Sequence, residues 1–160
     1  MTLGPVVLVE DSWADAELAC ETLAAAGLEN PVLVLRDGNE ALAYFRDCLT
    51  DPLRTGPALI LLDLNLPGID GRDILSMIKS DADLKKLPLV VVTGAEVELA
   101  NLGYYGLEPH LAITKPINFA KLARAASAAG AYLHVGSSQK PSVRVFGAPV
   151  RESVLAVDEG

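Results

Sequence analysis

Three carboxylates follow two apolar runs of the sequence, and their arrangement indicates a cation site. Residues 58–62 are all apolar and are followed by Asp63, and residues 5–9 are apolar and are followed by Glu10 and Asp11. Apolar runs of this length are typical of strands buried on both faces of a parallel sheet. Since ligands bind at the carboxyl ends of such strands, we expect the three side chains to form an acidic pocket. Crowded carboxylates favour a bound cation, and an all-oxygen set with open positions suits Mg²⁺.

A hydroxyl and an amine follow two further apolar runs. Thr93 comes directly after residues 90–92, and Lys115 stands between residues 111–114 and Pro116. At the same sheet edge, a hydroxyl and an ammonium beside a magnesium–carboxylate site suit a phosphoryl group better than a neutral ligand. Asp63 would then be a nucleophile that forms an acyl phosphate, with positioning and charge neutralisation as the main contributions to the reaction.

The elements that must position these residues alternate between strands and helices. Short loops between them predict a flavodoxin-like, doubly wound α/β fold of the (βα)5 type, with a five-stranded parallel sheet in the order 2-1-3-4-5. Ser12 and Asn118 fit helix N-caps, and Gly27 fits a helix end. We expect strands at residues 5–10, 32–36, 58–63, 87–92 and 111–114, and helices at residues 12–26, 38–49, 72–80, 95–105 and 118–133.

The C-terminal part of the chain has a different composition. Residues 136–142 read as a flexible linker, and residues 143–146 alternate like a short strand. We therefore expect one domain at residues 1–134, and a linker with a C-terminal arm at residues 135–160. The arm is too short to build a core alone, so it docks or stays disordered. Our hypothesis is that the arm is exchanged between two chains of a homodimer.

Length and charge exclude several classes of protein. The chain has 160 residues and a formal net charge of −8. That length predicts one domain, and the acidity argues against a nucleic-acid-binding surface. No apolar stretch approaches the roughly 20 residues of a membrane helix, and the N-terminus lacks the pattern of a secretory signal. Cys20 and Cys48 read as small core residues of a reduced, cytoplasmic protein.

Together these motifs resemble the receiver domain of the two-component response regulators, over about residues 5–134. The resemblance implies that Asp63 accepts a phosphoryl group from a sensor histidine kinase. It implies that Asp11 and Asp63 ligate Mg²⁺ together with the backbone carbonyl of Asn65, and that Glu10 holds a metal-bound water. The matching motifs are Glu10-Asp11, Asp63, Pro67-Gly68, Asp70-Gly71, Thr93 and Lys115-Pro116.

The resemblance also assigns the residues that would contact the phosphoryl group. It implies that Thr93 and Lys115 bind the phosphoryl oxygens, and that the bond between Lys115 and Pro116 is cis. One position departs from the family pattern, because Ala112 stands three residues before the lysine, where the family usually has Tyr or Phe. Switching through an aromatic side chain at that position is therefore not expected.

Three segments look more particularly like stand-alone regulators that are paired with bacterial phytochromes and similar sensor kinases. The segments are residues 9–15, 35–38 and 61–67. In the first segment, Trp13 is the single tryptophan of the chain and would lie beside the pocket. Trp13 is either a packed core residue or a docking contact for the kinase, since an exposed tryptophan favours interfaces.

We interpret the chain as a single-domain response regulator, not an enzyme, that signals to protein partners by a conformational change. One alternative is a haloacid dehalogenase-like phosphatase, which also combines an aspartate nucleophile with Mg²⁺ and a lysine. Those enzymes carry Asp-x-Asp, whereas Asn65 puts an amide in place of the second carboxylate. Another alternative is a receiver-fold interaction module that is not phosphorylated.

Overall fold

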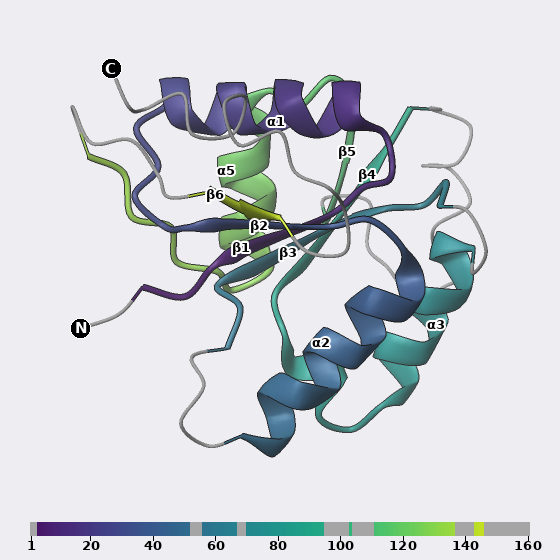
Figure 1. Cartoon of the computed structure of the whole chain (residues 1–160). Coiled ribbons are helices and arrows are strands. Elements are labelled where there is room, and N and C mark those ends of the chain that lie inside the picture. Colours follow the sequence, from purple (N-terminus) through teal and green to yellow (C-terminus); the bar gives the residue numbers. More distant parts are fainter. Residues whose placement is uncertain are drawn as a thin grey trace.

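The computed structural model is a parallel sheet with helices on both faces (Figure 1). It describes residues 3–51, 56–66, 70–94, 103, 111–136 and 143–145. The strands are β1 (Val6–Val9), β2 (Val32–Leu35), β3 (Leu59–Asp63), β4 (Leu89–Thr93), β5 (Ala112–Thr114) and β6 (Val143–Val145). The helices are α1 (Trp13–Ala25), α2 (Gly38–Thr50), α3 (Gly71–Ser80) and α5 (Phe119–Ala128), with a 3-10 turn, η1 (Leu84–Lys86), between α3 and β4.

The order of the strands across the sheet is β5-β4-β3-β1-β2-β6, and every neighbouring pair is parallel. The predicted order 2-1-3-4-5 and the flavodoxin-like fold are therefore confirmed. The sixth strand, β6, comes from the segment that the sequence predicts to be strand-like, and it pairs with the outer edge of β2. The sheet places β1 beside β3, so the two strands that carry the acidic residues are neighbours.

Side-chain alternation along the strands divides the interior into two cores. In β1, Val7 and Val9 pack with α2 and α3 on one face, while Val6 and Leu8 pack with α1 and α5 on the other. The same alternation runs through β2, β3 and β4, whose residues are buried throughout. This double burial explains why the strands read as unbroken apolar runs.

The helix ends follow the local signals of the sequence, with one exception. The Ser12 hydroxyl accepts a hydrogen bond from the Asp15 amide, and the Asn118 side chain caps α5. Gly27, at a φ of 83°, follows α1 as expected. The last helix ends at Ala128 and not at residue 133, because Gly130 adopts a φ of 83°, which a helix cannot continue through.

Two further differences from the sequence-based expectations lie around α3 and β4. The fourth strand begins at Leu89 and not at residue 87, because residues 84–86 form a 3-10 turn that the sequence pattern did not predict. The expected helix at residues 95–105 lies outside the described residues, apart from Gly103. Within the described part of the chain, the helices are too short or too polar to cross a membrane.

The segment after α5 is held against the N-terminal half of the domain. Val135 forms an isolated antiparallel bridge with Leu28. The buried Asn30 side chain accepts a hydrogen bond from the His134 amide at 2.7 Å and donates one to the Gly4 carbonyl at 2.8 Å. One amide therefore joins three chain segments and directs the C-terminal segment toward the β2 side of the sheet.

Candidate functional site

The site begins with Glu10 and Asp63, which follow the same alternation as the core. Leu8 and Leu61 belong to the core beneath α1 and α5, and a strand repeats its facing every second residue. Glu10 and Asp63 therefore face the same side, at the carboxyl ends of the adjacent strands β1 and β3. Each residue is only 3% exposed, so their charges need partners close by.

Three carboxylates gather at this edge. Oxygen atoms of Glu10, Asp11 and Asp63 all lie within 4.8 Å of one another. A set of carboxylate oxygens this close fits a small, hard cation such as Mg²⁺. The orientation of the Asp63 carboxylate is fixed by a hydrogen bond, because its Oδ1 accepts from the Asn65 backbone amide at 3.0 Å. The role of the Asn65 carbonyl as a ligand remains a prediction.

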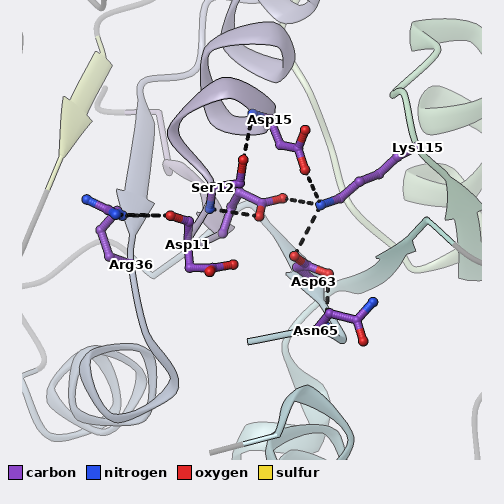
Figure 2. A network of polar contacts seen from close by, with 8 residues as sticks. Asp11, Ser12, Asp15, Arg36, Asp63, Asn65 and Lys115 are labelled. Atoms are coloured by element: carbon purple, nitrogen blue, oxygen red, sulfur yellow. Dashed lines mark hydrogen bonds and ion pairs between the residues drawn. The ribbon is translucent and has the colours of Figure 1, made fainter. Parts of the chain in front are cut away.

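The Lys115 ammonium is the cation of the site in this structure (Figure 2). Its Nζ lies 2.7 Å from Glu10 Oε1, 2.7 Å from Asp15 Oδ2 and 3.1 Å from Asp63 Oδ2. The sequence predicts Lys115 and two of these three partners. The third partner, Asp15, lies in the first turn of α1, and its contact with Lys115 does not follow from the sequence.

Burial and charge shift the proton affinities of this cluster. Burial raises the pKa of Glu10 to about 7, Lys115 works against that shift, and the neighbouring Asp63 adds to it. Burial alone would lower the pKa of Lys115, but its hydrogen bonds to Asp15 and Glu10 raise that pKa well above its ordinary value. The lysine is therefore firmly charged, whereas Glu10 holds its carboxylate form only with help from a cation.

The structure places Thr93 at the carboxyl end of β4, beside the strand that carries Asp63. Its carbonyl accepts a hydrogen bond from the Lys115 amide at 2.8 Å, and its side chain is fully buried. The bond between Lys115 and Pro116 is cis, as the sequence predicts. Ala112 is the first residue of β5. Contact of the Thr93 hydroxyl with a phosphoryl group remains a prediction.

Arg36 fixes the loop that carries Asp11. Its guanidinium donates two hydrogen bonds to the Asp11 carbonyl, at 3.0 and 3.2 Å, and lies 4.6 Å above the ring of Trp13. Trp13 is half-buried and also packs against the core under α1 and α5. Trp13 therefore has a structural role, and its role in docking a kinase stays a prediction. Arg36 lies within the segment 35–38 that resembles the phytochrome-paired regulators, but the sequence alone does not indicate this contact.

The loop after β3 is held by a close approach of α3. The Gly71 amide donates a hydrogen bond to the Leu64 carbonyl at 3.0 Å. A Cβ at Gly71 would lie 2.5 Å from the Asp63 carbonyl oxygen and 2.5 Å from the Leu64 Cα. Only glycine fits there without moving the backbone that carries Asp63. This requirement gives a physical reason for the Asp70-Gly71 motif.

A cavity of about 450 Å³ opens beside these residues. Glu10, Asp15, Asp63 and Lys115 line its polar side, and the apolar lining includes Leu18 on α1. The cavity thus lies beside the strand ends that carry Glu10 and Asp63 and extends to Leu18, which is largely exposed on α1. The arrangement thus combines a nucleophilic carboxylate, a set of oxygens that fits a metal ion and a fixed ammonium beside one cavity.

Fold and site together define the class of protein. Residues 6–127 match the family model described as the response regulator receiver domain. The chain belongs to this family.

Comparison with individual proteins gives the same result. The chain is 39% identical over 117 residues to the response regulator Rcp1 of Synechocystis sp. This alignment covers 73% of this chain and 80% of Rcp1. The match to a structure of the bacteriophytochrome response regulator AtBRR covers 86% of this chain and 100% of the AtBRR chain, with a TM-score of 0.76 and 33% sequence identity. The match to a crystal structure of the phosphorylated cyanobacterial phytochrome response regulator RcpA covers 80% of this chain and 89% of the RcpA chain, with a TM-score of 0.59 and 38% sequence identity. The chain is therefore a response regulator with homologues among the phytochrome response regulators.

Proposed function

We propose that Asp63 is the residue that accepts the phosphoryl group. The observation that carries this proposal is the position of the Asp63 carboxylate, which is buried at the end of β3 with the Lys115 ammonium 3.1 Å away. An oxygen of Asp63 attacks the phosphorus of the donor, the new bond from oxygen to phosphorus forms, and the bond from phosphorus to the donor breaks with its electron pair. Lys115 then donates to a phosphoryl oxygen, and Thr93 donates to another.

We also propose a magnesium ion at the acidic cluster. Asp11 and Asp63 would hold the ion directly with the Asn65 carbonyl, and Glu10 would hold it through water. The close set of carboxylate oxygens supports this assignment. A crystal structure of Rcp1 contains Mn²⁺, a cation with similar ligand preferences. When bound, such an ion neutralises charge on the phosphoryl oxygens.

The donor in our proposal is a sensor histidine kinase of the phytochrome type, since the homologues include phytochrome response regulators. The protein would act in the cytoplasm, and its two buried cysteine thiols fit a reducing compartment. Phosphorylation would shift a two-state equilibrium at the ends of β4 and β5, and the output would be contact with protein partners, not turnover of a substrate.

Intact-mass measurement tests the phosphoacceptor. The protein is incubated with acetyl phosphate and Mg²⁺, and we expect the wild type to gain the mass of one phosphoryl group. Asp63→Asn should gain none. Asp73→Asn is the matched control, because it removes an exposed carboxylate from nearby α3, and it should behave like the wild type. Equal phosphorylation of the wild type and Asp63→Asn would refute the assignment.

We further propose that residues 135–160 form an arm that two copies exchange in a homodimer. The outer edge of β2 accepts β6 in the single chain, and an open strand edge accepts a strand from a second copy by the same hydrogen bonds. Sedimentation of the protein with residues 136–160 deleted tests this arrangement. The truncated protein should be a monomer and the full chain a dimer, and a dimer that survives the deletion would contradict the exchange.

A further inference from the structure

Lys115 has three carboxylate partners, and one of them is not part of the metal-binding set. Glu10 and Asp63 belong to the cluster that fits Mg²⁺, whereas Asp15 does not. Asp15 Oδ2 accepts from Lys115 Nζ at 2.7 Å, a shorter contact than that between Asp63 and the lysine. An ammonium has three hydrogens, so these three contacts use its whole donor capacity. Figure 2 shows Asp15 on the α1 side of the ammonium and Asp63 on the sheet side.

The backbone of Asp15 is fixed independently of Lys115. It lies in the first turn of α1, where the Ser12 hydroxyl accepts a hydrogen bond from its amide. A carboxylate in the first turn is also favoured by the helix dipole. The carboxylate is therefore presented by a capped helix and reaches a lysine that lies 100 residues further along the chain.

We propose that Asp15 is a positioning residue that holds the Lys115 ammonium toward Asp63 for phosphoryl transfer; this rests on the function proposed above for Asp63. A lysine side chain has four rotatable bonds, and fixing its end in advance removes an entropic cost from the reaction. With one hydrogen given to Asp15 and one to Glu10, the third is directed at Asp63 Oδ2, 3.1 Å away. The ammonium is then oriented before the donor arrives.

The charge of Asp15 has an opposing effect, since a carboxylate near a phosphoryl group repels it. That repulsion is the smaller effect, for two reasons. The Asp15 side chain is 43% exposed, so water screens its charge at a distance. Its nearest charged neighbour is the lysine itself, which neutralises it at contact distance. Orientation of the ammonium acts directly on the reacting group, so loss of Asp15 should slow the reaction.

The test is the rate of phosphorylation of Asp15→Asn by acetyl phosphate with Mg²⁺, followed by intact mass. The substitution keeps the shape and removes the charge. We expect a rate about 3- to 10-fold below that of the wild type, as for loss of a partly exposed charged hydrogen bond. Glu21→Gln is the matched control, because it removes one carboxylate from an exposed position on the same helix. Its rate should equal that of the wild type.

A double-mutant cycle distinguishes positioning from a general effect on α1. If Asp15 acts through the lysine, Asp15→Asn should have no further effect in a Lys115→Ala background. The same slowing in that background, an equal slowing in Glu21→Gln, or faster phosphorylation of Asp15→Asn would each overturn the inference. A wild type that takes up no phosphoryl group would instead overturn the function proposed for Asp63, so the two failures are distinguishable.

Discussion

The buried Glu10 carboxyl makes the stability of the metal-free protein fall as pH rises through the neutral range. In the folded protein its pKa is raised from 4.5 to about 7, with burial as the largest cause. Between these two values the folded state holds a proton that the unfolded state has lost. The stabilising contribution of that proton is fully present below 4.5 and is lost as pH rises through the folded pKa.

The size of this loss follows from the shift. One pKa unit corresponds to about 1.4 kcal/mol, so the shift of the Glu10 pKa from 4.5 to about 7 gives at most about 3.5 kcal/mol, and relaxation of the cluster reduces it to about 2 kcal/mol. Such a loss lowers the melting temperature of a domain of this size by roughly 4–8 °C. Lys115 adds no pH dependence of the stability, since its raised pKa keeps it charged throughout the neutral pH range. Asp81 adds none either, because its lowered pKa acts only in more acidic solution.

The assay is urea unfolding in the presence of a chelator, at a series of pH values from about 5 to about 8. The free energy of unfolding should fall over this range in the wild type. It should stay nearly constant in Glu10→Gln, where the carbon skeleton is kept and the titrating group is gone. With saturating Mg²⁺ the wild type should lose its slope, because the cation compensates the ionised carboxylate. A metal-free stability that is flat or that rises with pH, or an equal slope in Glu10→Gln, would refute this reasoning.

Four further predictions concern single residues. Asp63→Asn should stabilise the metal-free protein by about 1 kcal/mol in urea unfolding, because it removes like-charge repulsion within the acidic cluster. Gly71→Ala should destabilise the protein by about 2 kcal/mol in the same assay, since its methyl group collides with the loop that carries Asp63. Arg36→Ala should weaken Mg²⁺ binding about fivefold in calorimetry, because the Asp11 carbonyl loses both guanidinium hydrogen bonds. Trp13→Ala should slow phosphotransfer from the kinase while sparing acetyl phosphate, if the half-buried ring also contacts the kinase.

Each of these predictions has an outcome that contradicts it. A less stable metal-free Asp63→Asn would mean that the contact with Lys115 outweighs the repulsion. A Gly71→Ala protein of unchanged stability would mean that the loop between β3 and α3 can move to accommodate the methyl group without a loss of folding free energy. Unchanged magnesium affinity in Arg36→Ala would separate Arg36 from the metal site. Equal loss with both phosphodonors in Trp13→Ala would reject docking and leave only the packing role.

The fold was predictable because burial on two faces leaves a strong signal. β1 is apolar at every position, and β3 is apolar up to its last residue, Asp63, which therefore stands out. Once the strand order is fixed by the right-handed crossovers, the ends of β1 and β3 must be neighbours. The positions of Glu10, Asp63 and Lys115 at one sheet edge therefore follow from the sequence and the topology together.

The contacts of Asp15 and Arg36 were not predictable in the same way. Asp15 meets a lysine 100 residues away, and Arg36 meets a carbonyl 25 residues away, so each contact depends on side-chain directions that the topology alone does not give. The sequence carries a partial signal, since Asp15 and Arg36 lie in the segments 9–15 and 35–38 that resemble the phytochrome-paired regulators. The early end of α5 had a clear signal in Gly130, which the helix propensity of the surrounding alanines obscured.

The most direct test of the central claim is to locate the phosphoryl group on the chain. After incubation with a phosphodonor and Mg²⁺, reduction with borohydride converts an aspartyl phosphate to homoserine, and peptide mass spectrometry identifies the position. We predict homoserine at position 63, formed only when Mg²⁺ is present. Homoserine at another aspartate, or unmodified Asp63 in a protein that has gained phosphoryl mass, would contradict the account.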